Sequence, residues 1–91
     1  MDEMNRLRNR IDSLDAEIVA TLAQRFEVVR MIGQLKRSDG IAMMQPERVR
    51  HVREHYQSCG REQGIPTDFT TRFVELLLAA TCAMEDEIIA G

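Results

Sequence analysis

The sequence has 91 residues, of which 44% are hydrophobic and 30% charged, and its formal net charge is −3. This length corresponds to one domain, and the acidic balance argues against nucleic-acid binding, which needs a basic surface. No stretch approaches the roughly 20 apolar residues of a membrane-spanning helix. Asp2 and Glu3 stand where a signal peptide would be basic, and two cysteines are too few for a disulfide scaffold. We therefore expect a cytoplasmic protein with reduced thiols and no membrane partner.

The residue composition favours an all-α protein. Sheets are enriched in aromatic and β-branched residues, whereas this chain has no Trp, one Tyr and three Phe. Tight hairpins favour Asn-Gly or Asp-Gly turns, and the chain offers only Asp39-Gly40. We predict a single domain over residues 1–91 that consists of three helices, one long and two shorter.

The first predicted helix covers residues 3–38, and Gly40 suits a left-handed C-terminal cap. Its seam positions alternate by three and four residues, which is the spacing of a helix that faces a partner helix. These positions are Met4, Leu7, Ile11, Leu14, Ile18, Thr21, Arg25, Val28, Ile32 and Leu35. Such a helix is about 52 Å long, whereas a compact domain of this size is roughly 30 Å across. Its seam must therefore pack on another chain, which predicts a homodimer.

The two shorter helices are predicted over residues 46–62 and 67–90. Pro46 fits the first turn of the earlier one, and Gly60 and Gly64 are expected to loosen its end. Thr67 or Asp68 is expected to cap the later one. The buried face of the last helix is predicted to consist of Phe69, Phe73, Leu76, Leu77, Ala80, Met84 and Ile88.

Three cations on the first helix have informative spacings. Lys36 lies eleven residues after Arg25, almost three whole turns, so both side chains point the same way, with Gly33 leaving space between them. Arg8 lies seventeen residues before Arg25, so it points about 100° away around the helix. It cannot serve the same pocket from the same helix, but it can reach a partner's pocket. The alternative is that Arg25 sets the register of the seam and that Arg8 and Lys36 are solvated.

The segment from His51 to His55 matches the H-x-x-E-H pattern of some zinc peptidases. A catalytic zinc needs a third protein ligand, and no motif supplies one, so we expect an exposed helix face and no metal. The chain also lacks a glycine-rich phosphate loop and a G-x-S-x-G nucleophile motif. What remains is a cluster of Arg and Lys side chains, which suits a dicarboxylate ligand.

Five segments resemble the all-helical chorismate mutase family, and the similarity, which includes the three-helix layout, covers nearly the whole chain. They are Leu7-Arg8, Ile11-Asp12-Ser13-Leu14-Asp15, Leu22-Ala23-Gln24-Arg25, Ile32-Gly33-Gln34-Leu35-Lys36 and Pro46-Glu47-Arg48. The resemblance implies an intertwined homodimer with two equivalent sites. It also implies a Claisen rearrangement of chorismate to prephenate, as in aromatic amino acid metabolism, without a metal or a cofactor.

In family terms, each site takes three cations from one chain and Arg8 from the other. The resemblance implies that Arg8 and Arg25 hold the two substrate carboxylates. Lys36 would donate to the ether oxygen, where negative charge grows as the C–O bond breaks. Arg48 would support a carboxylate.

Four further positions complete the site that the resemblance implies. Thr81 stands where the family has a small hydroxyl residue near a carboxylate, and Glu85 stands where it often has a glutamine facing the ether oxygen. Gln45 and Val49 occupy positions that are commonly acidic and meet the ring hydroxyl. These two departures leave other activities open. The alternatives are a 4-amino-4-deoxychorismate mutase, an isochorismate-pyruvate lyase, and a dimerisation or regulatory module without activity.

Overall fold

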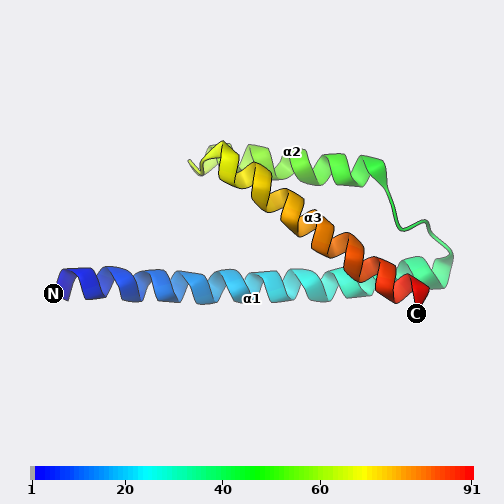
Figure 1. The fold of residues 1–91 in the computed structure, drawn as a ribbon, viewed down its shortest axis with the longest axis horizontal. Helices are drawn as coiled ribbons and strands as arrows, with labels where there is room; N and C mark the ends of the chain where they lie inside the picture. Colours follow the sequence, from blue (N-terminus) through cyan, green and yellow to red (C-terminus); the bar gives the residue numbers. More distant parts are fainter. Residues whose placement is uncertain (1) are drawn as a thin grey trace.

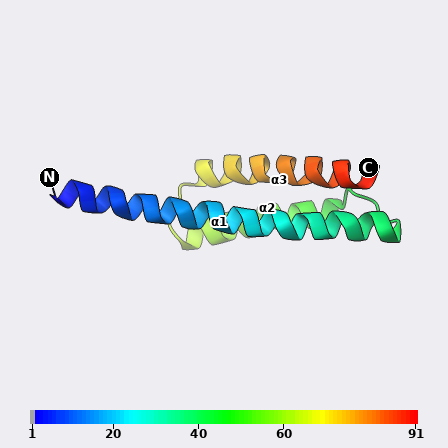
Figure 2. The same ribbon diagram turned by 90° about the horizontal axis from the view of Figure 1, so that it is seen from below.

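The computed structural model describes residues 2–91, and these form three α-helices and no strand (Figure 1). Helix α1 spans Asp2–Asp39, α2 spans Pro46–Glu62 and α3 spans Thr67–Ala90. The prediction of an all-α chain with one long and two shorter helices is confirmed. Within the described residues, α3 packs on both other helices, whereas α1 and α2 do not pack directly on each other. Helix α3 runs from the end of α2 back to the C-terminal part of α1 (Figures 1 and 2).

Glycines in the left-handed conformation end the first two helices. Gly40 has a φ of 65°, as predicted, and the Ile41 N–H donates to the Lys36 carbonyl at 2.9 Å. Gly64 has a φ of 72°, and the Ile65 N–H donates to the Gly60 carbonyl at 2.9 Å. Both ends satisfy carbonyls that the helix itself leaves free. Each helix is thereby stopped at a defined residue, which sets where the following segment turns.

The predictions for the ends of α2 and for the start of α3 were partly wrong. Pro46 does occupy the first turn of α2, but Pro66, not Thr67 or Asp68, takes the N-cap position of α3, and no side chain caps it. The cause is Pro66, whose extended backbone leads directly into the helix, so that Thr67 is already helical. Gly60 does not loosen α2 either. It lies inside the helix, where an added Cβ would come within 2.8 Å of the Thr70 Oγ1, so it allows α3 to approach closely.

The buried hydrophobic core is small and lies where α3 meets the other helices. It consists of Val29, Val52, Val74, Leu77 and Leu78. The predicted face of α3 was therefore only partly right. Leu77 is buried, whereas Phe69 is 59% and Leu76 71% exposed. Helix α3 has apolar residues on two sides, and periodicity alone does not say which side meets its own chain.

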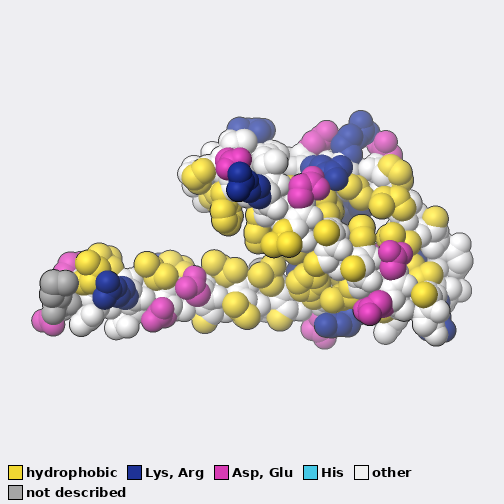
Figure 3. Space-filling view, viewed as in Figure 1, with side chains coloured by type: hydrophobic (Ala, Val, Ile, Leu, Met, Phe, Trp, Pro, Cys, Tyr) yellow, Lys and Arg dark blue, Asp and Glu magenta, His cyan; other side chains and the backbone are white. Residues whose placement is uncertain are grey.

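The N-terminal half of α1 projects from the rest of the chain. Every residue from 2 to 21 is exposed, and apolar side chains run along the projecting part (Figure 3). They include Met4, Leu7, Ile11, Leu14 and Ile18, each at least 39% exposed. The radius of gyration is 16.6 Å, whereas a compact chain of this length has one near 12 Å. The chain therefore leaves its predicted seam uncovered.

None of the described helices is both long enough and apolar enough to cross a membrane.

Candidate active site

A cavity of about 310 Å³ lies where all three helices and the α1–α2 connector meet. Its wall contains seven of the eight site residues predicted from the sequence. Helix α1 contributes two of them, the connector one, and α2 and α3 two each. These seven are Arg25, Lys36, Gln45, Arg48, Val49, Thr81 and Glu85. The structure thus brings together residues that are as much as 60 positions apart, from Arg25 to Glu85.

Arg8 is the predicted site residue that the single chain does not bring to the cavity. It lies on the exposed N-terminal half of α1. Seventeen residues of helix separate it from Arg25, which corresponds to about 25 Å along the axis. No arginine side chain extends that far, so Arg8 cannot reach the cavity of its own chain.

Arg25 is tied to α3 by a hydrogen bond. Its Nη1 donates to the Thr81 Oγ1 at 3.0 Å. Both residues are partly buried, and both line the cavity. Because a guanidinium has five N–H donors in a fixed planar fork, one bond to Thr81 orients the plane and leaves other donors for a ligand.

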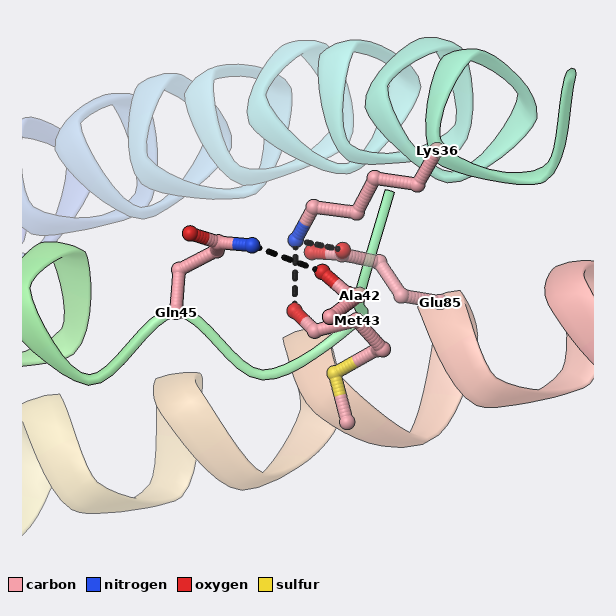
Figure 4. A network of polar contacts seen from close by, with 5 residues as sticks. All are labelled: Lys36, Ala42, Met43, Gln45 and Glu85. Carbon is pink, nitrogen blue, oxygen red and sulfur yellow. Dashed lines mark hydrogen bonds and ion pairs between the residues drawn. The ribbon is translucent and has the colours of Figure 1, made fainter. Parts of the chain in front are cut away.

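Lys36 lies in a polar network that lines the cavity (Figure 4). Its Nζ donates to the Glu85 Oε1 at 2.7 Å and to the Met43 carbonyl at 2.7 Å. The Lys36 and Glu85 side chains are only 15% and 8% exposed. The sequence showed the cation and the carboxylate, but it gave no sign that they pair.

Gln45 shapes the connector next to this network. Its Nε2 donates to the Ala42 carbonyl at 2.9 Å, which leaves the side-chain oxygen free to accept (Figure 4). Arg48, one turn into α2, is exposed at the cavity. Together with Arg25 and Lys36 it gives the cavity three cations against the single carboxylate of Glu85. Such a surplus of positive charge suits an anionic ligand.

Sequence reasoning missed the apolar part of the wall. Val29, Ile32, Val52, Leu78, Cys82 and the connector residues Met43 and Met44 all line the cavity. For the first two a signal existed, since they lie four and seven residues after Arg25 and so share its helix face. For Met43 and Met44 there was none, because a connector has no periodicity.

The H-x-x-E-H segment lies on the exposed face of α2, as predicted. His51 and His55 stack with ring centroids 5.9 Å apart and planes 8° apart. Among residues 2–91, no three potential metal ligands come together in a way that could hold an ion.

The fold and the cavity define an all-helical protein with a cationic, apolar-walled binding site. Comparison with known proteins identifies the family to which such a protein belongs. The family model for chorismate mutase type II matches residues 7–86. The 4-amino-4-deoxychorismate mutase of Streptomyces pristinaespiralis is 32% identical over 99% of this chain and 70% of its own length. A protein of the same name from Streptomyces venezuelae is 27% identical, over 98% of this chain and 86% of its own length.

A more distant relative is the chorismate mutase of Methanocaldococcus jannaschii, 18% identical over 98% of this chain and 90% of its own length. The family match covers most of the chain, so the chain belongs to the type II chorismate mutase family. The family and the names of these relatives make it an isomerase.

Proposed function

We propose that the cavity binds chorismate and catalyses its rearrangement to prephenate. The observation that carries this proposal is the convergence of Arg25, Lys36 and Arg48 around one cavity with apolar walls. Chorismate carries two carboxylates, which paired cations bind by charge-assisted hydrogen bonds. The rearrangement is unimolecular, so the protein needs only to hold the reacting ends together and to stabilise charge as it develops.

Each polar residue then has a role that follows from its place. Arg25, oriented by Thr81, holds one carboxylate, and Arg48, an exposed residue of the cavity wall, supports a carboxylate. Lys36 donates to the ether oxygen, where negative charge grows as the C–O bond breaks. The apolar wall excludes water, which strengthens these interactions. Gln45 and Val49 also line the cavity, and we assign them to the side of the substrate ring that carries the hydroxyl, as the resemblance implies.

We propose further that the site is completed in a homodimer by Arg8 of the partner subunit. Two features support this. The exposed apolar stripe of α1 is typical of a helix that packs on a second chain. Arg8 also belongs to that projecting half, far from the cavity of its own chain. In the proposed dimer, a second copy packs on the stripe and its Arg8 completes the cavity of the first chain.

A second candidate substrate is 4-amino-4-deoxychorismate, in which an amino group replaces the ring hydroxyl. The two Streptomyces relatives carry that activity in their names. The cavity wall also holds the free oxygen of Gln45, which accepts a hydrogen bond from an ammonium as well as from a hydroxyl.

The test is a direct comparison of substrates. The purified protein is incubated separately with chorismate, with 4-amino-4-deoxychorismate and with isochorismate, and substrate loss and product are followed by absorbance and chromatography. We expect turnover of chorismate or its amino analogue without added metal. Arg25→Ala should lower kcat/KM at least about 100-fold.

Arg30→Ala is the matched control, because Arg30 is an exposed arginine of the same helix outside the cavity wall. It should leave kcat/KM unchanged. Release of pyruvate from isochorismate would replace the proposal with a lyase activity. Binding without turnover of any of the three compounds would replace it with a non-catalytic role.

A further inference from the structure

Glu85 is a buried carboxylate in an otherwise cationic site. The residue is 6% exposed, and its side chain comes from α3 toward the end of α1. A carboxylate taken out of water is destabilising unless it is paired and hydrogen-bonded. Here the Lys36 ammonium provides the pairing, with 2.7 Å between Nζ and Oε1. Within residues 2–91, no buried side-chain nitrogen or oxygen lacks a hydrogen-bond partner.

Lys36 is held from two elements at once. An ammonium has three N–H donors in tetrahedral arrangement. One reaches Glu85 on α3, and one reaches the Met43 carbonyl in the connector, each at 2.7 Å (Figure 4). Because the arrangement is tetrahedral, the directions of two N–H bonds fix the direction of the third. One N–H is therefore left, and its direction is set by Glu85 and Met43 rather than by the flexible lysine chain.

We propose that Glu85 is a positioning residue, which holds Lys36 so that its remaining N–H points to the reacting atom of the substrate. This inference rests on the proposed function. It differs from the expectation that residue 85 itself faces the ether oxygen. A carboxylate that forms an ion pair accepts hydrogen bonds and has none to give. Glu85 thus acts on the substrate only through Lys36.

Each of the three helices contributes a further charged or titratable group to the cavity wall around this pair. These groups are Arg25 on α1, Arg48 on α2 and Cys82 on α3. Glu85 is the only carboxylate among the residues that line the cavity. A substitution that neutralises it therefore leaves the Lys36 ammonium without an anionic partner among the residues that line the cavity.

The substitution Glu85→Gln distinguishes a residue that positions Lys36 from a residue that itself donates a hydrogen bond to the substrate. If Glu85 positions Lys36, the neutral amide is a weaker partner, and kcat should fall about tenfold while KM changes less than about twofold. If residue 85 instead donates to the substrate, the amide supplies a donor and kcat should rise. A rise at neutral pH would overturn the proposal. Glu87→Gln, at an exposed position of the same helix, is the control and should leave kcat unchanged.

A double-mutant cycle with Lys36→Met tests whether Glu85 acts through Lys36. Once the ammonium is gone, Glu85→Gln should have no further effect on kcat/KM beyond about twofold. An equal loss with and without Lys36 would overturn the proposal, because it would show a separate action of Glu85. Circular dichroism melting of each variant identifies any that fails to fold, and Glu85→Asp then replaces Glu85→Gln, since its shorter side chain withdraws the carboxylate from Lys36.

A readout without substrate keeps this inference distinct from the proposed function. Nuclear magnetic resonance of the ¹⁵N-labelled lysine ammonium groups should show a slowly exchanging Lys36 signal in the wild type. The signal should disappear in Glu85→Gln and persist in Glu87→Gln. A wild type that turns over no substrate but keeps this signal contradicts the proposed function alone. A Lys36 signal that is indifferent to Glu85→Gln contradicts the inference alone.

Discussion

Thr81 is the residue whose substitution tests the orientation of Arg25 most cleanly. Its Oγ1 accepts from the Arg25 Nη1 at 3.0 Å. Thr81→Val keeps the shape and removes the acceptor, which costs about one net hydrogen bond. We expect KM to rise about two- to tenfold, because the guanidinium is less well oriented toward a carboxylate. Steady-state kinetics of the wild type, Thr81→Val and Thr81→Ser provide the measurement.

Thr81→Ser retains the hydroxyl and serves as the control. Its KM should stay close to that of the wild type. An equal rise of KM in both variants would assign the effect to the lost methyl packing rather than to the hydrogen bond.

At the scale of residues, what the sequence predicts depends on distance along the chain. Arg25 and Lys36 were placed on one face because helical periodicity relates positions within one helix rigidly. The ion pair of Lys36 with Glu85 joins residues 49 positions apart, and its formation depends on tertiary packing and on rotamers. The resemblance to a family put both residues in one site, but it did not show that they hold each other.

At the scale of elements, α2 and α3 are linked at their outer surface by Arg53 and Glu75. The Arg53 Nε lies 2.6 Å from one carboxylate oxygen, and a second hydrogen bond of 3.1 Å reaches the other. The hydrogen bond from Arg53 lowers the pKa of Glu75 below its ordinary value of 4.5, and the positive charge acts in the same direction. A carboxyl group whose pKa is lower in the folded state stabilises the fold above its unfolded pKa, and this contribution is lost as pH falls through the folded pKa.

Glu75→Gln should therefore lower the melting temperature slightly at pH 7. The difference from the wild type should close as the pH falls below the ordinary pKa of 4.5. The effect is small because both side chains are exposed, and it should shrink at high salt. Thermal melts between pH 3 and about 7 in low salt measure it.

Glu54→Gln, an exposed carboxylate of α2, is the control and should show no such pH-dependent gap. If the melting temperature of Glu75→Gln stayed below that of the wild type even at about pH 3, the loss would not come from the ion pair, and the prediction would be wrong.

The ends and faces of the helices also show which features the sequence pattern predicts correctly and which it does not. Gly40 marked the end of α1 because only glycine takes the left-handed conformation at little cost. The cap of α3 was misplaced because Thr67 and Asp68 are good capping residues whose context is set by Pro66. The face of α3 was misassigned because Leu76 and Leu77 are both apolar, and only packing decides which of them is buried.

At the scale of the whole molecule, the projecting half of α1 makes the oligomeric state the central question. The proposed dimer should have a mass near twice 10.5 kDa by light scattering. Arg8→Ala and Arg25→Ala should each be nearly inactive alone. After mixing and subunit exchange, each heterodimer should regain about half of the wild-type rate, because one of its two sites has both arginines.

The control is each variant mixed with itself, which should stay inactive. Exchange is verified by mass spectrometry of differently tagged chains. Verified exchange without recovery would place both arginines in one site, and a folded monomer at micromolar concentration would contradict the dimer.

The separation of Arg8 from the other cations along α1 also has a genetic consequence under the proposed dimer. Two defective alleles of the gene, one changed at Arg8 and one at Arg25, produce mixed dimers in which one site is undamaged, so a cell carrying both retains activity. Alleles changed at Arg25 and Lys36 damage the same half of every site, and no combination of their chains leaves one intact. The proposed dimer therefore predicts two complementation groups among such alleles, divided by which chain of the dimer supplies the residue to the site.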